Sequence, residues 1–589
     1  MIGTVWLGAP KPNFNSKNSS VGKIMGNKSA MLAGLASIVA APAGAQFNQP
    51  TEYAPAQADL VIEDAQIYTP DGWATTLAIA DGVIIAVGSE ADIAPFRSVS
   101  TMVLDLDGRT VMPGLHDMHV HPMGAGMAQS ACDIPHGSDA EAALAVVRQC
   151  ADDAEPGEWI TGGGYDNNSL GVAPTQLMLD EVAPDNPVLL RDISGHSAWA
   201  NSSALAIAEI DSSTSDPEGG IIERDTRGVP TGVLREAAAM LVSSRIPEVS
   251  VEDGAAALAW SLDEMASFGI TAFDDAGVSE TTARAYNLLA DQGDLDLRVR
   301  GCLWGGDMGL IARHMEFARD NFSPTCVKLV LDGVPTDGHT AAMIEPYADA
   351  GHGEHDQTAR ERGLLLVPQD ELNTLVADLD RRGFTVKFHA AGDAAVRAGL
   401  DAIEFARALN GYSGQYHNVG HNSFVQMNDI GRARDMFASF EFSPYIWYPS
   451  PIIGDIRRAV GEERMQRWIP VKDALDAGAL VVPGSDWSVV PSVNPWIAIE
   501  TLVTRQVPGG GGEMLGAQER ITLEQAVDIF TRQSAQQMNF GHATGTIETG
   551  KLADIIVIDR NIFEVPITDV HETQVLMTFV GGELVYTAD

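Results

Sequence analysis

Three histidines and an aspartate lie within six positions of one another in the stretch VMPGLHDMHVHP, residues 111 to 122. The whole chain has only 14 histidines among 589 residues, so this cluster is a candidate functional site. His119 and His121 are two positions apart, and residues so spaced along a β-strand point to the same face. Paired imidazoles suit Zn²⁺ and similar divalent ions, which activate water and polarise carbonyl groups. The chemistry that this stretch favours is therefore metal-assisted hydrolysis.

Residue types that bind metals also occur in several later strand-like runs. Lys328 lies in CVKLVLDG and His389 in FTVKFHAAGD, while His421 and Asp486 lie in QYHNVGHNS and LVVPGSDW. A lone histidine in an apolar strand is more often a core residue than a ligand. Six suitable residues at corresponding places in different strands instead indicate one shared site.

Apolar strand-like runs alternate with helical patterns through the middle of the chain, which is typical of a parallel sheet covered by helices. Eight strands are expected: LHDMHVH, GITAFDDAG, LRVRGCLW, CVKLVLDG, FTVKFHAAGD, QYHNVGHNS, FASFEFSP and LVVPGSDW. Eight such units form a barrel whose active face lies at the carboxyl ends of the strands. We therefore predict an α/β fold, a distorted TIM (β/α)8 barrel, in which the candidate ligands meet at one end.

Short strand patterns separated by turns occupy both ends of the chain, and together they predict one small β-sandwich domain. Its first part is expected at residues 46–113 and its second part at 541–589. The barrel is expected at residues 114–540. It carries an insertion at about 124–250, because that stretch is too long for a single crossover connection.

Residues 1–45 are predicted to be a signal peptide and leader. Lys23 and Lys28 precede the short apolar stretch AMLAGLASIVAAPAGAQ, which ends in small residues as export signals do. The stretch before Met25 is polar, so translation is expected to start at Met25 rather than Met1. The run is too short for a membrane span. A periplasmic or secreted protein, without membrane insertion after signal removal, is expected; a disordered cytoplasmic leader is the alternative.

The four cysteines would then meet an oxidising compartment. Cys132 and Cys150 flank a helix-like segment and could form a disulfide across it. Cys302 and Cys326 lie in two strand-like runs, and we expect them to be buried free thiols. The sequence alone does not fix the pairing.

The chain is strongly acidic, with 37 Lys+Arg against 80 Asp+Glu and a formal net charge of −43. Such a charge argues against nucleic acid and against anionic membrane surfaces as partners. It fits adaptation to a salty medium. A small-molecule substrate is the expected partner, and a homodimer is one assembly that the sequence allows.

The stretch PGLHDMHVHP resembles the opening metal motif of the amidohydrolase superfamily. Over nearly the whole mature chain the sequence is similar to the amidohydrolase-3 branch, which includes YtcJ-like and AepA-like proteins. The motifs that carry this resemblance are GGGYDNNSL, PVLLRDISGHSAWANSSAL, GIIERDTRGVPTGVLREAA, VKLVLDG, FHAAGDAAV, GSDWSV and TGTIETGKLADIIVID.

The resemblance implies a pair of divalent metal ions, with Zn²⁺ expected. His119 and His121 would be ligands of the more buried ion, and His389 and His421 ligands of the second. Lys328 would be carboxylated on its amine by carbon dioxide. The resulting carbamate carries negative charge and two oxygens, so it can bridge two cations that an ammonium group would repel.

Asp486 is implied to be the catalytic residue and a further ligand of the first ion. It would take a proton from the metal-activated hydroxide and pass it to the leaving nitrogen. The implied activity is hydrolysis of a C–N bond in an amide or N-acyl group by an exported enzyme. Two alternatives stay open: hydrolysis of a carboxylic or phosphoric ester at the same site, and a barrel that binds or regulates without catalysis.

Three residues are candidates for substrate contact. His196 lies in a motif shared with the family, and Tyr165 and Trp447 lie in aromatic stretches that could wall a pocket. The alternative for the two aromatic residues is that they simply pack.

Two of the expected strands contain a second histidine beside the expected ligand. Where many family members have an acidic residue before the histidine of the sixth strand, this chain reads HNVGHNS, so His417 is the fallback for His421. In the first strand, His116 is oddly spaced from His119 and is expected to be structural. Asp117 shares the face of His119 but lies deeper, where it could support the ligands.

Overall fold

The computed structural model describes residues 57–588 except for 130, 136, 166–168, 193–196, 218–219, 336–338, 349–360 and 445–450. The expected leader therefore lies outside the described residues. Within the described ranges, no helix is long and apolar enough to span a membrane.

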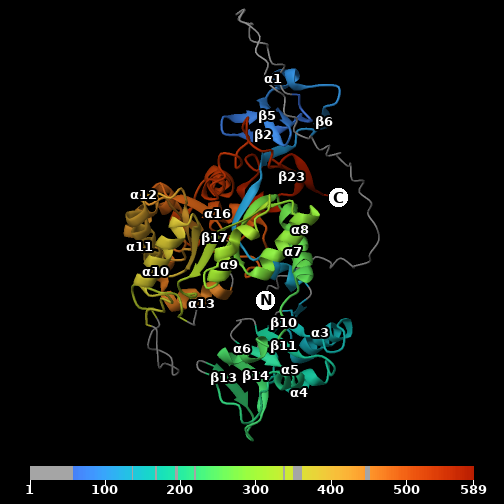
Figure 1. Ribbon diagram of the computed structural model, residues 1–589, viewed down its shortest axis with the longest axis vertical. Coiled ribbons are helices and arrows are strands. Elements are labelled where there is room, and N and C mark those ends of the chain that lie inside the picture. The colour runs from blue at the N-terminus through green and yellow to red at the C-terminus, as the bar shows by residue number, and fades with distance from the viewer. Residues whose placement is uncertain are drawn as a thin grey trace, which may run out of the picture. The chain divides into compact units, whose positions relative to one another are not determined.

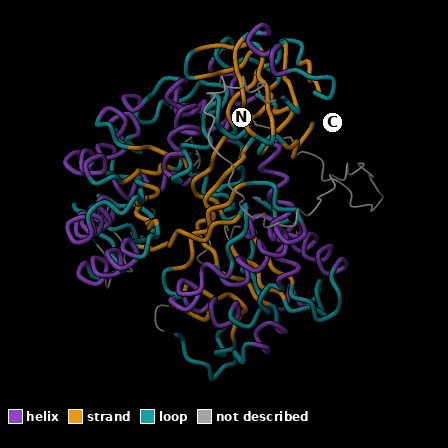
Figure 2. The backbone as a smooth tube through the Cα atoms, turned by 45° about the horizontal axis from the view of Figure 1, so that its top comes forward, coloured by secondary structure: helices purple, strands orange, loops and turns teal. Residues whose placement is uncertain are grey.

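Eight parallel strands form one sheet that curls into a nearly closed barrel (Figures 1 and 2). In spatial order they are β8 (Leu115–Val120), β15 (Ile270–Val278), β16 (Arg298–Trp304), β17 (Phe322–Val330), β18 (Thr385–Ala390), β19 (His417–His421), β20 (Ala438–Phe442) and β21 (Leu480–Pro483). The ends approach each other after β21, where the Asp486 backbone N–H donates to the His119 carbonyl over 2.7 Å. The predicted α/β barrel, with its eight strands, is confirmed.

Amphipathic helices cover the outer face of the barrel. They include α7 (Val251–Ser267), α8 (Glu280–Gln292), α10 (Gln369–Arg381), α11 (Asp393–Asn410) and α12 (Met427–Asp435). In α7 the side chain of Ser250 caps the first turn, and Leu258, Leu262 and Met265 form a buried stripe at helical spacing. Because both faces of the barrel strands are covered, these strands read as nearly continuous apolar runs.

Further helices outside the inserted segment are α1 (Glu90–Ile93), α9 (Met308–Arg313), α13 (Pro451–Val460), α14 (Glu462–Met465), α15 (Val471–Asp476), α16 (Pro495–Thr504), α17 (Leu523–Asp528) and α18 (Ser534–Gln537).

Two further sheets lie outside the barrel, and one of them combines strands from both ends of the chain. One contains β5 (Val83–Gly88), β4 (Thr76–Ala80), β1 (Leu60–Glu63) and β6 (Met102–Asp105). The other contains β24 (Glu583–Thr587), β23 (Val575–Val580), β22 (Ile555–Ile558), β7 (Thr110–Pro113), β2 (Gln66–Thr69) and β3 (Gly72–Ala74). Side chains of both sheets share one core, which includes Ile62, Leu77 and Ile555. The predicted β-sandwich from both chain ends is thus confirmed, and β7 leads directly into β8.

The segment between α2 (Pro122–Ala128) and α7 folds around a sheet of its own. Its strands in spatial order are β13 (Gly220–Arg224), β14 (Pro230–Glu236), β12 (Ser197–Ala200), β11 (Val188–Asp192), β10 (Ile160–Tyr165) and β9 (Cys132–Asp133). Its helices are α3 (Ala140–Asp153), α4 (Gln176–Asp180), α5 (Ser202–Ile207) and α6 (Ala237–Ser243).

All four cysteines form disulfides. Cys132 of β9 is joined to Cys150 of α3, as the sequence suggested. Cys302 is joined to Cys326, so the expectation of free thiols at this pair was wrong. The two residues are direct partners in the register of β16 and β17, which hydrophobic periodicity within each strand cannot reveal.

Candidate metal centre

Three of the expected ligands face one another at the carboxyl ends of β8 and β21. The Asp486 Oδ1 atom lies 3.4 Å from His121 Nε2 and 3.6 Å from His119 Nε2. One ligand atom from each residue falls within 4.8 Å of the others. Two imidazole nitrogens and a carboxylate oxygen are ligands that Zn²⁺ prefers, so the residues present fit a divalent ion.

The other three expected ligands lie beside this group. Lys328 Nζ is 2.8 Å from His119 Nε2. The His421 ring centroid is 4.7 Å from that of His119 and 4.3 Å from that of His389. The structure therefore brings all six sequence-predicted ligands into one cluster.

Each of three histidines in the cluster has its Nδ1 atom engaged by another side chain. His119 Nδ1 lies 2.6 Å from Glu441 Oε1, and His389 Nδ1 lies 3.2 Å from Asp332 Oδ1. His421 Nδ1 lies 3.2 Å from Ser443 Oγ. A carboxylate only accepts hydrogen bonds, so His119 and His389 donate through Nδ1 and keep the lone pair of Nε2 for a metal.

These supporting residues were not found from the sequence. Glu441 stands in the apolar run FASFEFSP and Asp332 in LVLDG, and an acidic residue inside an apolar strand was the available signal. The Asp332 carboxylate also accepts hydrogen bonds from the backbone N–H groups of Ala391, Gly392 and Ala342, over 2.8–3.0 Å. It thereby fixes the loop that follows β18 as well as the His389 ring.

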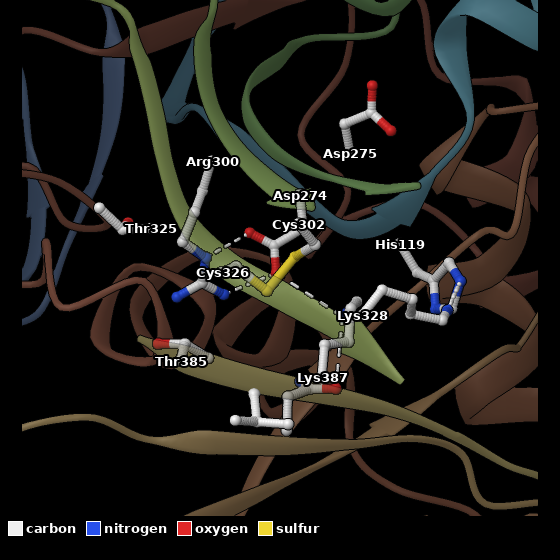
Figure 3. Close-up of a disulfide and its surroundings, with 12 residues drawn as sticks. His119, Asp274, Asp275, Arg300, Cys302, Thr325, Cys326, Lys328, Thr385 and Lys387 are labelled. Carbon is white, nitrogen blue, oxygen red and sulfur yellow. Dashed lines mark hydrogen bonds and ion pairs between the residues drawn. A yellow bond between two sulfur atoms is a disulfide. The ribbon is translucent and has the colours of Figure 1, made fainter. Parts of the chain in front are cut away.

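Glu441 also belongs to a buried network of charges, of which Figure 3 labels Lys387, Asp274 and Arg300. Lys387 forms ion pairs with Glu441 and, over 3.6 Å, with Asp274. Asp274 is held in turn by Arg300, whose guanidinium donates two hydrogen bonds of 2.6 and 2.8 Å to its carboxylate. Two cations and two anions alternate, so each buried charge has an opposite neighbour.

The surroundings favour neutral imidazoles. Burial, reinforced by the Lys328 and Lys387 ammonium groups, lowers the pKa of His119 well below its ordinary value. Burial and the neighbouring His389 do the same to the pKa of His421. A neutral imidazole is the form that binds a metal ion.

Two of the expected ligands lie on left-handed backbone, which residues with side chains rarely adopt. The φ angle is 69° at His421 and 62° at Asp486. Such conformations cost about 1–3 kcal/mol each and cluster at functional sites. Here the turn at the end of each strand aims the side chain across the mouth of the barrel.

The fallback histidine lies elsewhere. His417 begins β19, where its Nε2 is 2.9 Å from Asp380 Oδ1 and its Nδ1 accepts from the Val386 N–H over 3.0 Å. It therefore occupies the opposite end of the strand from His421, and His421 is the residue brought into the cluster.

The other histidine and aspartate of the first strand have supporting contacts. His116 is buried, its Nδ1 lies 3.3 Å from the Gly114 carbonyl, and burial lowers its pKa to about 4. Asp117 Oδ1 accepts hydrogen bonds from the backbone of His119, over 3.1 Å, and of Ser485, over 3.0 Å. Asp117 thus ties β8 to the turn that carries Asp486, and burial raises its pKa to about 7.

Of the three residues expected to contact substrate, the structure describes only Tyr165, and it does not lie at the cluster. Tyr165 is buried in the core of the inserted segment, with its ring centroid 5.6 Å from that of Trp199, so it packs there. His196 and Trp447 lie outside the described residues.

Comparison with known proteins agrees with this geometry. A model of the amidohydrolase family matches residues 102–586. The chain belongs to the amidohydrolase family. The family resemblance predicted from the sequence is therefore confirmed.

Relatives of this amidohydrolase cover most of the chain. It is 28% identical to the N-substituted formamide deformylase of Arthrobacter pascens, over 90% of this chain and 98% of that protein. It is 30% identical to the exoenzymes regulatory protein AepA of Pectobacterium carotovorum subsp. carotovorum, over 60% of this chain and 78% of that protein. A solved structure of an uncharacterized metal-dependent hydrolase from Pyrococcus furiosus superposes with a TM-score of 0.70 at 25% identity. It covers 85% of this chain and 99% of its own.

Proposed function

We propose that this amidohydrolase-family protein is a metal-dependent hydrolase that cleaves the C–N bond of an amide or N-acyl substrate. The observation that carries the proposal is the orientation of the histidines. The Nδ1 atoms of His119, His389 and His421 are engaged by Glu441, Asp332 and Ser443, beside Lys328 and Asp486. Such outer hydrogen bonds are how proteins orient metal ligands.

The cluster offers ligands for a pair of divalent ions, Zn²⁺ being our choice. His119, His121 and Asp486 would hold one ion, and His389 and His421 the other. When bound, such ions supply a Lewis acid for the carbonyl group and make water a nucleophile at neutral pH.

Lys328 is proposed to join the two positions as a carbamate. Burial and the Lys387 ammonium lower the pKa of Lys328 to about 8, so more of its amine is neutral near pH 7 than for an exposed lysine. The neutral nitrogen adds to the carbon of carbon dioxide, a C–N bond forms, and one proton is released. The product is a carbamate, whose negative charge suits a place between the two divalent ions.

Asp486 is proposed to move the proton of the reaction. Its side chain is 11% exposed and lies beside His119 of β8 and His121, which follows that strand, at the mouth of the barrel. It accepts a proton from the attacking water and donates it to the nitrogen of the leaving amine. Because one carboxylate serves both steps, removing it stops turnover.

The choice of a C–N bond is supported by the relative named N-substituted formamide deformylase, which is 28% identical over 90% of the chain. We also propose that the protein is exported and acts in the periplasm or outside the cell on a small molecule. The two disulfides support this location, because disulfides persist in oxidising compartments.

The test is a panel of N-acyl amines, amides, carboxylic esters and phosphoric esters, assayed with the native protein and with Asp486→Asn. We expect turnover of an amide or N-formyl compound, and a loss of about 10³-fold or more in kcat in the variant. Asp435→Asn, at an exposed position, is the control and keeps native turnover. Turnover of esters alone would replace the C–N assignment.

A second candidate is a barrel that binds or regulates without catalysis. It is favoured by the relative named exoenzymes regulatory protein AepA, at 30% identity. Absence of turnover across the panel, in protein loaded with zinc and bicarbonate, would select this candidate.

A further inference from the structure

The disulfide between Cys302 and Cys326 lies inside the barrel beneath the metal ligands. Both cysteines are fully buried. Cys326 precedes Lys328 by two positions in β17, so the two side chains share the interior face of the strand. Figure 3 draws the disulfide together with Lys328, Lys387 and Asp274.

The pairing of β16 with β17 is irregular just before this disulfide. Arg300 pairs with Ser323, but the next pair is Cys302 with Cys326, so β17 contains one extra residue there. One of the residues in the extra stretch is Pro324, which has no N–H to donate to the ladder. An extra residue in one strand is a β-bulge, which leaves that residue unpaired and locally disrupts the ladder of hydrogen bonds.

The register after the bulge decides where Lys328 points. Trp304 pairs with Lys328, two positions beyond the disulfide on each strand. A slip by one residue would turn every later side chain of β17 to the opposite face of the sheet. Lys328 would then point toward the covering helices and away from His119 Nε2, which is now 2.8 Å from Nζ.

The interior position of Lys328 needs such support. Lys328 is buried, and Lys387 is its direct partner in the register of β17 with β18. Taking a lysine amine out of water costs free energy, so desolvation favours a register that releases the side chain. A covalent link just below it opposes that release.

We propose that the Cys302–Cys326 disulfide is a positioning element for Lys328, and that the second metal position forms only in the oxidised chain. The inference rests on the proposed function, because it assigns Lys328 to a bridge between two ions. Its consequence is that loading with metal and carbon dioxide follows disulfide formation during maturation.

The other disulfide is a matched control. Cys132 and Cys150 are separated by 18 positions and Cys302 and Cys326 by 24. The entropy that a disulfide removes from the unfolded chain varies only with the logarithm of loop length, so the two have similar effects on stability. Cys132–Cys150 lies in the inserted segment, which contributes none of the six ligands.

The experiment compares the native protein with Cys302→Ala/Cys326→Ala and Cys132→Ala/Cys150→Ala at a temperature where circular dichroism shows all three folded. Divalent metal per chain is measured by elemental analysis, and activity is titrated with bicarbonate. We expect the first variant to fall from about two ions per chain to about one, and to need at least tenfold more bicarbonate for half-maximal activity. The control variant keeps native values for both.

If Cys302→Ala/Cys326→Ala, the barrel variant, keeps native metal content and native bicarbonate dependence, the inference is overturned and the proposed function stays intact. Native protein without metal would instead defeat the proposed function itself. If the barrel variant does not fold, native chain produced with its thiols reduced replaces it, with free thiols counted by mass spectrometry. Full metal loading of reduced, folded chain would overturn the inference, and loss of about one ion would support it.

Discussion

At the scale of single residues, Glu441 is the most informative side chain that the sequence did not single out. It is fully buried, accepts from His119 Nδ1 over 2.6 Å, and is ion-paired with Lys387. One carboxylate therefore fixes the tautomer of an expected metal ligand and neutralises a buried cation. This double role makes it sensitive to removal of its charge.

Glu441→Gln should reduce metal affinity by about 10- to 100-fold, because the amide cannot both balance Lys387 and hold the His119 ring as a carboxylate does. Affinity is measured by competition with a chelator of known strength. Asp380→Asn, which disturbs a buried carboxylate–histidine pair at the other end of the barrel, should leave metal affinity native. Equal metal affinity in native protein and Glu441→Gln would show that Glu441 does not support metal binding.

The six residues of the cluster could be selected from the sequence because they lie in or just after five apolar strands, where spacing and residue type can be read locally. Glu441, Asp332 and Ser443 could not be assigned in the same way. Their role depends on which strands are neighbours and on how far each strand is staggered against the next, as in the pairing of Ala390 with His421. Register of this kind is a tertiary property.

At the scale of elements, the amino-terminal end of the barrel is held by a second buried network. Asp380, near the end of α10, accepts hydrogen bonds from Arg407 of α11 over 2.6 Å and from His417 of β19 over 2.9 Å. Burial raises the pKa of Asp380, but hydrogen bonds from His417, Ser413 and Asn410 outweigh it, and the pKa lies below its ordinary value. The network joins two helices to one strand.

Asp380→Asn should lower the free energy of unfolding by about 3 kcal/mol at pH 7, because it leaves Arg407 buried beside a neutral partner. A depressed carboxyl pKa contributes stability that is present above the ordinary pKa and is lost as pH falls through the folded-state value. The difference between native and variant should therefore shrink below about pH 4. Denaturant titrations over a pH series measure it, and a difference independent of pH would contradict the assignment.

The strands and the two-ended sandwich could be predicted at this scale because hydrophobic periodicity and turn residues are local signals. The disulfide in the barrel could not, because a bulge in β17 sets Cys326 opposite Cys302. Nothing in either strand's own pattern contains that offset. The sequence therefore did not reveal the Cys302–Cys326 disulfide, on which the position of Lys328 is proposed to depend.

At the scale of the whole molecule, the formal net charge of −43 is the dominant feature. Like charges repel within the folded chain, and salt screens that repulsion, shortening the Debye length from about 10 Å at 0.1 M to about 3 Å at 1 M. The thermal midpoint should therefore rise by several degrees over that range of potassium chloride. Differential scanning calorimetry checks this, and a flat or falling midpoint would show that the acidic surface does not limit stability.

We have proposed that the mouth of the barrel holds a pair of metal ions and that Lys328 completes this site. The sharpest test is elemental analysis of protein purified without chelators and supplied with bicarbonate. We expect about two divalent ions per chain in the native protein and a loss of at least one in Lys328→Ala. Protein that binds no metal, even after zinc and bicarbonate are added back, would contradict it.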